Sequence, residues 1–195
     1  MFSGASCDFH GHCDLFLLDS PAAANGAGLS IQVCSSPCRE IFSYISAAAI
    51  QIGGHVLTIG SGGQHAIDGV PQVLGNTGAL NQHPVCSSAS KTGRHVHKIH
   101  LGKGPSHGRE EIDIRECTNW ITIAVLHPTA ANLEKSVGLL GCFPDGALLG
   151  RDGKTIHTSF DDFGQDWQAP PCDSLLGPGP FLDNSCVPLQ AKKDH

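Results

Sequence analysis

Ser43 to Gly60 reads SYISAAAIQIGGHVLTIG. Two runs of mostly apolar residues, Ile45 to Ile52 and His55 to Ile59, lie on either side of the pair Gly53-Gly54. Glycine readily adopts the positive φ angles that two-residue hairpin turns require, so a glycine pair between apolar runs is a hairpin signal. This stretch therefore predicts two antiparallel strands joined by a tight turn.

Similar patterns extend through most of the chain. Leu29, Ile31 and Val33 alternate with polar or small residues, which is the period of two of a half-buried strand. Gln64 to Ile67 runs into Asp68-Gly69, a second hairpin signal. Further strands are predicted at Asp14 to Leu18, His95 to His100, Glu111 to Arg115 and Trp120 to Leu126. The sequence therefore predicts an all-β fold, an antiparallel β-sandwich of short strands with long loops.

Other segments lack a strand pattern. Pro71 to Arg94 is rich in Gly, Asn, Ser and Pro, which predicts a long loop or a poorly ordered insertion. Only Thr129 to Leu139 is expected to form a helical turn or two. The residues after Trp167 include five prolines and two cysteines, which predicts an extended tail. We therefore expect one β-sandwich domain over residues 1–168 and a C-terminal tail over residues 169–195.

Composition excludes several classes of protein. The chain has 195 residues, of which 40% are hydrophobic and 15% charged, a balance typical of a globular domain. Its formal net charge of -6 provides no basic surface for nucleic acid. No apolar run approaches the ~18 residues that a membrane-spanning helix needs, so we expect no membrane span.

The cysteines indicate an oxidising compartment. Nine cysteines are many for a cytosolic chain and ordinary for a secreted one. The chain contains no CxxC pair, which argues against a zinc ribbon. The odd number leaves at least one cysteine unpaired or bonded to another chain. The first residues, MFSGASCDF, lack the charged and apolar regions of a signal peptide. Either a leader is absent or the chain is part of a longer protein.

Gly138 to Gln168 reads GLLGCFPDGALLGRDGKTIHTSFDDFGQDWQ. Its order of motifs, G-L-x-G-x-[FY]-x-[DN]-G, an aspartate-rich turn and D-D-F-G-x-x-W, resembles the C-terminal part of a von Willebrand factor type D domain. Ser6 to Leu18, SCDFHGHCDLFLL, resembles the opening strand pair of that family, and Ser43 to Gly60 resembles its paired central strands. The resemblance covers roughly Ser6 to Gln168 and implies a disulfide-stapled β-sandwich.

The resemblance also implies a calcium site. In the family, calcium is held by an aspartate of the opening motif and by oxygens from the glycine loop, and the matching carboxylates here are Asp8, Asp145 and Asp152. Cys142 stands where the family usually has an asparagine, and Pro144 lies at or beside the next ligand position. Neither residue supplies a hard side-chain oxygen. The site has therefore lost ligands or shifted register relative to the family. Calcium is the cofactor that the resemblance implies, and the alternative is that these aspartates only begin turns.

The resemblance further implies disulfide pairings. It pairs Cys13 with Cys172, and it matches Cys34 and Cys38 to a cysteine pair after the second strand, whose partners stay open. Cys142 falls outside the matched pairs. We expect it to be a free thiol, to join a second chain, or to bond another cysteine of this chain.

Histidines form two dense patches, at His10 and His12 and at His95, His97 and His100. Residues two apart on a strand face the same side, so His10 with His12, or His95 with His97, could bind zinc or copper. The chain has no HExxH motif. Solvent-facing strand histidines are the interpretation that we favour.

The expected function is that of a non-catalytic extracellular module of the type D kind, which serves adhesion, matrix structure or assembly and is stabilised by calcium. Its expected partners are other extracellular proteins or copies of itself. Two alternatives stay open: a metal-dependent enzyme with histidine-bound zinc or copper, and a carbohydrate-binding β-sandwich.

Overall fold

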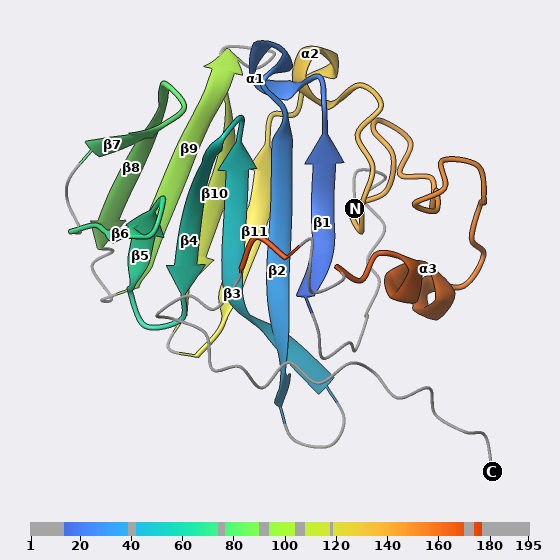
Figure 1. The fold of residues 1–195 in the computed structure, drawn as a ribbon, viewed down its shortest axis with the longest axis horizontal. Helices are drawn as coiled ribbons and strands as arrows, with labels where there is room; N and C mark the ends of the chain where they lie inside the picture. The colour runs from blue at the N-terminus through green and yellow to red at the C-terminus, as the bar shows by residue number, and fades with distance from the viewer. Residues whose placement is uncertain are drawn as a thin grey trace.

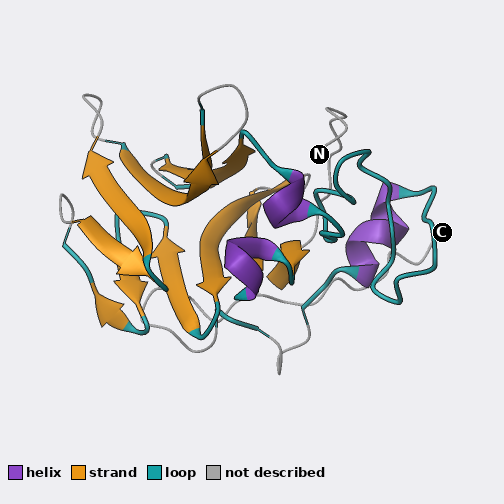
Figure 2. Ribbon diagram, turned by 90° about the horizontal axis from the view of Figure 1, so that it is seen from above, coloured by secondary structure: helices purple, strands orange, loops and turns teal. Residues whose placement is uncertain are grey.

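The structure is a computed structural model of the chain. It describes residues 14–38, 42–73, 77–89, 94–103, 108–117, 119–169 and 174–176, without the side chains of residues 37, 38, 42, 77 and 103. Two antiparallel sheets pack face to face, with short helices at one end and at one side (Figures 1 and 2). The predicted all-β sandwich is confirmed at this level.

The first sheet has six strands in the order β1-β2-β3-β4-β5-β6. They are β1 (Asp14–Ser20), β2 (Leu29–Cys38), β3 (Phe42–Ile52), β4 (His55–Gly60), β5 (His65–Ile67) and β6 (Val70–Pro71). Consecutive strands are neighbours throughout, so this sheet is a simple meander of hairpins.

The second sheet has five strands in the order β11-β10-β9-β8-β7. They are β7 (Thr77–Leu80), β8 (His83–Ala89), β9 (His95–Lys103), β10 (Arg109–Glu116) and β11 (Ile121–Leu126). This sheet is also a meander, and it lies behind the first sheet in Figure 1.

Three short helices complete the described elements: α1 (Ala23–Gly26), α2 (Ala130–Leu133) and α3 (Phe160–Asp166). Seen from above in Figure 2, α1 and α2 lie over one end of the sandwich and α3 lies to one side. None of the helices among the described residues is long and apolar enough to cross a membrane.

Both glycine-containing hairpins form where the sequence predicts them. Ile52 pairs with His55 around Gly53-Gly54, and Gly53 has a φ of 60°. Ile67 pairs with Val70 around Asp68 and Gly69, which have φ values of 50° and 76°. The positive φ angles are the reason for glycine at these turns.

The prediction of a long loop over residues 71–94 is wrong, because β7 and β8 form a hairpin there. Its turn consists of Asn81 and Gln82, which both have positive φ angles, 46° and 69°. A glutamine at such a position is not a recognised turn signal. Leu80 and Val85 are buried and fix the hairpin against the core. The expectation of helix only within residues 129–139 is also incomplete, since α1 and α3 both lie outside it.

The core fills the space between the two sheets. Residues of alternating position supply it: Leu29, Ile31, Val33, Ala48, Ile50, Ile52, Leu57 and Ile59 from the first sheet, and Leu80, Val85, Ile99, Leu101, Ile112, Ile114 and Ile121 from the second. This alternation is the predicted one for β2.

The outer face of the first sheet carries a second, smaller cluster. Ala47 and Ala49 of β3 and Cys34 of β2 pack there against Leu176, which is 3% exposed. In Figure 1 the segment 174–176 crosses this face in red-orange. The Leu175 amide donates to Gln32 Oε1 at 2.7 Å, which fixes the segment on β2. The rest of the predicted tail lies outside the described residues.

Candidate functional site

Segments from the two ends of the described chain meet at the outer edge of β1. The amides of Leu139 and Leu140 donate to the carbonyl oxygens of Phe16 and Leu17, each at 3.1 Å. The Phe16 amide donates to Trp167 O at 3.0 Å. The glycine-rich segment and the closing tryptophan segment therefore both extend the sheet at β1, where an unpaired edge would otherwise remain.

Gly138 is required at this junction. Its φ is 122°, and a Cβ atom built on it would lie 2.8 Å from the backbone oxygen of Leu17. A side chain would therefore separate the glycine segment from β1. The Trp167 ring packs edge-on to Phe16 with ring centroids 6.4 Å apart, and its indole N–H donates to Leu149 O at 3.0 Å.

The two candidate calcium ligands in this segment each hold a local turn. Asp145 Oδ1 accepts from the Ala147 amide at 3.1 Å. Asp152 accepts from the amides of Lys154 and Thr155, each at 2.8 Å, and from the Thr155 hydroxyl at 2.7 Å. These bonds, chiefly those from Thr155, lower the pKa of Asp152 to about 2.

A third carboxylate lies close to Asp152. Asp166 Oδ2 accepts from the Arg151 amide at 2.9 Å and lies 3.1 Å from His157 Nε2. A Cβ atom on Gly150 would lie 2.6 Å from Asp166 Oδ2 and 3.3 Å from Asp152 Oδ1, so a side chain there would displace the Asp166 carboxylate. Asp8, the third predicted ligand, lies outside the described residues. Among the described residues, no group of three His, Cys, Asp or Glu is placed to hold a metal ion. The calcium site stays a prediction.

The cysteines whose side chains the structure describes are of two kinds. Cys34 is disulfide-bonded, to a partner outside the described side chains. Cys86, Cys117 and Cys142 are free and partly buried. Burial raises the pKa of Cys142, and the nearby Asp145 carboxylate raises it further. Cys13 and Cys172 are outside the described residues, and the Cys38 side chain is not described, so the predicted pairing stays untested.

The prediction of solvent-facing histidines is wrong for His97, whose side chain is fully buried between the sheets. His97 Nε2 lies 2.7 Å from Glu116 Oε1, and its Nδ1 lies 2.9 Å from Ser87 Oγ. With the Nε2 proton donated to the carboxylate, Nδ1 accepts from the Ser87 hydroxyl. His95 Nδ1 also contacts Glu116, at 3.3 Å. His10 and His12 lie outside the described residues.

His65 of β5 extends this inner cluster. Its ring lies against the His97 ring with centroids 4.7 Å apart, and its buried Nδ1 has no hydrogen-bond partner among the described residues. Burial lowers the pKa of His65, and the neighbouring His97 lowers it further. We name the side chains of His65, Ser87, His95, His97 and Glu116 the inner cluster.

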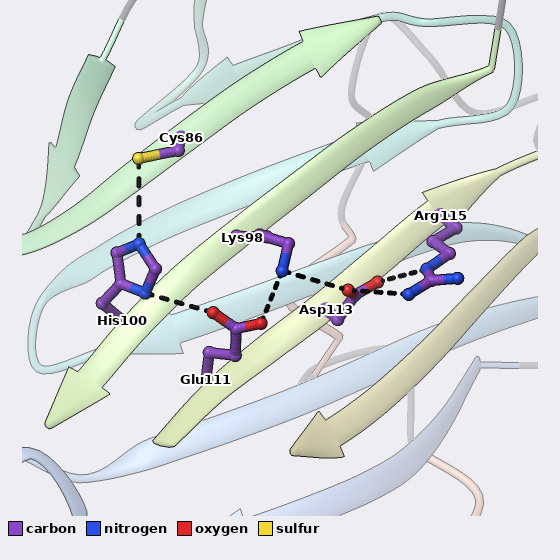
Figure 3. Close-up of polar contacts among 6 residues, drawn as sticks. All are labelled: Cys86, Lys98, His100, Glu111, Asp113 and Arg115. Carbon is purple, nitrogen blue, oxygen red and sulfur yellow. Dashed lines mark hydrogen bonds and ion pairs between the residues drawn. The ribbon is translucent and has the colours of Figure 1, made fainter. Parts of the chain in front are cut away.

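His100 lies on the opposite face of β9, so the three histidines of this strand do not form one patch. Figure 3 shows it between Cys86 and Glu111. Cys86 Sγ lies 3.9 Å from His100 Nε2, and His100 Nδ1 lies 3.3 Å from Glu111 Oε2. We name Cys86, Lys98, His100, Glu111, Asp113 and Arg115 the outer network.

Charges hold the outer network in place. Lys98 Nζ donates to Glu111 Oε1 at 2.6 Å and lies 3.6 Å from Asp113 Oδ2. Arg115 Nε donates to Asp113 Oδ1 at 2.8 Å. The Glu111 bond is the main cause that raises the pKa of Lys98.

Sequence reasoning missed the acidic partners of both groups, Glu116 and Glu111, and the two β8 residues, Ser87 and Cys86. One signal for buried histidines was present in the sequence. His95 and His97 lie on the same face of β9 as Ile99 and Leu101, which are apolar and face inward. No family model matches the sequence, and no curated protein shows significant similarity to it.

Proposed function

We propose that the chain is a non-catalytic extracellular module of the von Willebrand factor type D kind, which serves adhesion, matrix structure or assembly. One observation carries this proposal. The stretches that resemble the family's opening and closing motifs lie side by side, because Phe16 and Leu17 of β1 bond to Leu139, Leu140 and Trp167. Motifs about 120 to 150 residues apart in sequence are thus joined in one part of the structure.

The chemistry of the buried acidic residues supports a structural role. The Glu110 carboxylate, 1% exposed, accepts from the Thr129 amide and hydroxyl and from Asn132 Nδ2 at 2.6–2.8 Å. Glu116 is held by His97 in the same manner. Buried carboxylates that are satisfied by fixed donors stabilise a fold and are closed to substrates.

An extracellular location follows from the disulfides in this proposal. Cys34 is bonded, and Cys86, Cys117 and Cys142 are free, which leaves Cys7, Cys13, Cys38, Cys172 and Cys186 to supply its partner and two further bridges. Copies of the chain or other extracellular proteins are the proposed partners. Calcium is the proposed cation of the glycine loop, with Asp8, Asp145 and Asp152 as its carboxylates.

Thiol mapping tests the proposal. The protein is produced in an oxidising compartment, alkylated under denaturing conditions without reductant, digested and analysed by mass spectrometry. We expect alkylation at Cys86, Cys117 and Cys142 and a bridge between Cys13 and Cys172, because that bridge joins the two motif-bearing ends. Protein produced in a reducing cytosol and mapped in parallel is the control. Alkylation of most of the nine cysteines in the oxidised sample would overturn both the extracellular assignment and the family proposal.

A further inference from the structure

Cys86 lies on the outer face of the second sheet beside an imidazole. It is a free, partly buried thiol on β8, and its position alternates with the inward-facing Val85 and Ser87. Its sulfur lies 3.9 Å from His100 Nε2, within the range of a hydrogen bond that involves sulfur. His100 Nε2 is therefore placed to accept the thiol proton.

The imidazole is itself positioned by an acidic residue. His100 Nδ1 is buried, makes no aligned hydrogen bond among the described residues, and lies 3.3 Å from Glu111 Oε2. A contact of this kind strengthens when the imidazole gains a proton, because it then becomes an ion pair. Lys98 fixes the other Glu111 oxygen at 2.6 Å, so the carboxylate cannot turn away. The order thiol, Nε2, Nδ1, carboxylate is visible in Figure 3.

We propose that Cys86, His100 and Glu111 form a thiol–disulfide exchange site, with Cys86 as the nucleophile, His100 as its proton acceptor and Glu111 as a positioning residue. This inference goes beyond the proposed function and stands on the outer network alone. Its substrate class is a disulfide, of a small molecule or of a partner protein.

The Cys86 proton moves to His100 Nε2, and the thiolate attacks one sulfur of the disulfide. A new bond forms between that sulfur and Cys86 Sγ, and the disulfide bond of the substrate breaks. The departing thiolate takes the proton from His100. Cys86 is thereby oxidised to a mixed disulfide, and one sulfur of the substrate is reduced to a thiol.

The surroundings of Cys86 favour exchange over acyl transfer. β8 lies between β7 and β9 in the sheet, so its backbone N–H groups near Cys86 are used in the strand ladders. Acyl transfer needs free N–H donors for a carbonyl oxygen that becomes negative. Exchange needs none, because the negative charge passes from one sulfur to another.

The other free thiol that the sequence singled out is less suited to this chemistry. Burial and the Asp145 carboxylate both raise the pKa of Cys142, which keeps it protonated, and a protonated thiol is a poor nucleophile. Asp145 thus has the opposite effect on Cys142 from that of an imidazole on a thiol. The two cysteines form a natural pair for comparison.

The test measures the reaction of folded protein with dithiodipyridine in a stopped-flow instrument. We expect the fastest phase to vanish in Cys86→Ser and to persist in Cys142→Ser and Cys117→Ser. His100→Gln should slow this phase by about threefold to tenfold near pH 7, because the thiol then ionises without a base. Glu111→Gln should slow it less, and both variants should lose rate more steeply than wild type between about pH 8.5 and about pH 6.5.

The pH profile involves the titratable groups that surround the thiol in the described part of the chain. Lys98, His100, Glu111 and Asp113 face it from β9 and β10, and His83 of β8 contacts the His100 carbonyl oxygen. β7 has no titratable residue. Lys98→Met is the control for a loss of charge alone, and circular dichroism checks that each variant is folded. A fast phase retained in Cys86→Ser, or a rate and pH profile unchanged in His100→Gln, would overturn the proposal.

Two further arms separate the sources of the disulfide. Incubation with oxidised glutathione followed by intact-mass measurement reports a small-molecule adduct on Cys86. Non-reducing electrophoresis of purified protein incubated at high concentration reports copies that become linked through Cys86 during the incubation. Both products should be absent from Cys86→Ser, and absence of both from wild type would count against the site. Neither arm depends on the Cys13–Cys172 bridge. The outcome for the exchange site is therefore independent of the outcome for the family proposal.

Discussion

The two faces of β9 carry similar groups in different surroundings. On the inner face, His97 lies between the Ser87 hydroxyl and the Glu116 carboxylate and is fully buried. On the outer face, His100 lies between the Cys86 thiol and the Glu111 carboxylate, and 18% of its side chain is exposed. Each histidine therefore links a hydroxyl or thiol to an acid.

The two groups differ in their exposure to solvent and in the lengths of their polar contacts. The inner contacts of His97 measure 2.7 and 2.9 Å and leave neither ring nitrogen unpaired. The outer contacts of His100 measure 3.9 and 3.3 Å, and the thiol is partly exposed. A closed and satisfied group stabilises the fold. A looser group that reaches solvent is free to exchange protons and to react.

The largest expected effect comes from removing the inner imidazole. His97→Leu would leave the buried Glu116 carboxylate and Ser87 hydroxyl without their partner, which should lower the free energy of unfolding by about 3 kcal/mol. The matched variant His100→Leu on the outer face should cost less than about 1 kcal/mol, because its contacts are longer and partly solvated. Urea unfolding without reductant measures both. Equal losses in the two variants would contradict the contrast between the faces.

The next effect is a pH dependence from His65 of the inner cluster. Its folded-state pKa lies below the ordinary value of 6.5, since burial disfavours the charged ring. Below pH 6.5 the unfolded chain therefore binds a proton that the folded chain does not, and stability falls as the pH decreases toward the folded pKa. Above pH 6.5 this contribution is fully present. His97, His95 and Glu116 are the charged or titratable groups that act on the same ring.

Thermal unfolding at about pH 7.5 and about pH 5.5 measures this loss, which we expect to be a few degrees in Tm. His65→Gln cannot gain the proton and should lose less stability over the same interval. His55→Gln is the control, because His55 is exposed and bonds Asp68 at the surface. If His65→Gln is as acid-sensitive as wild type, another group causes the loss.

Local patterns predicted most of the fold. The Gly53-Gly54 and Asp68-Gly69 hairpins and the alternation in β2 have residue-level causes that act within a few positions. The β7–β8 hairpin was missed because its turn uses Asn81 and Gln82, which adopt positive φ angles only in this context. Its strands are fixed by burial of Leu80 and Val85 against residues distant in sequence.

The site was less predictable, because it depends on register between strands. The period of two places His95 and His97 on one face of β9 and His100 on the other. The partners of these histidines follow only once β8 and β10 are aligned, which sets Ser87 opposite His97 and Glu111 opposite His100. A sequence pattern within one strand contains no information on that alignment.

The smallest expected effect concerns an exposed carboxylate of the glycine loop. Asp152→Asn keeps one oxygen that accepts from the Lys154 and Thr155 amides, and it loses the negative charge and the second oxygen, which accepts from the exposed Thr155 hydroxyl. In chelator we therefore expect a Tm change of about one degree or less at neutral pH.

With calcium added, the proposed site predicts a rise in the wild-type Tm of a few degrees and a smaller rise in the variant. Asp161→Asn, in the first turn of α3, removes one charge outside the proposed ligand set and should respond like wild type. If wild type melts at the same temperature with calcium and with chelator, Asp145 and Asp152 serve only their turns and the loop has no cation. If Asp152→Asn instead loses as much stability in chelator as His97→Leu, then the contrast between satisfied buried groups and exposed ones fails at this residue.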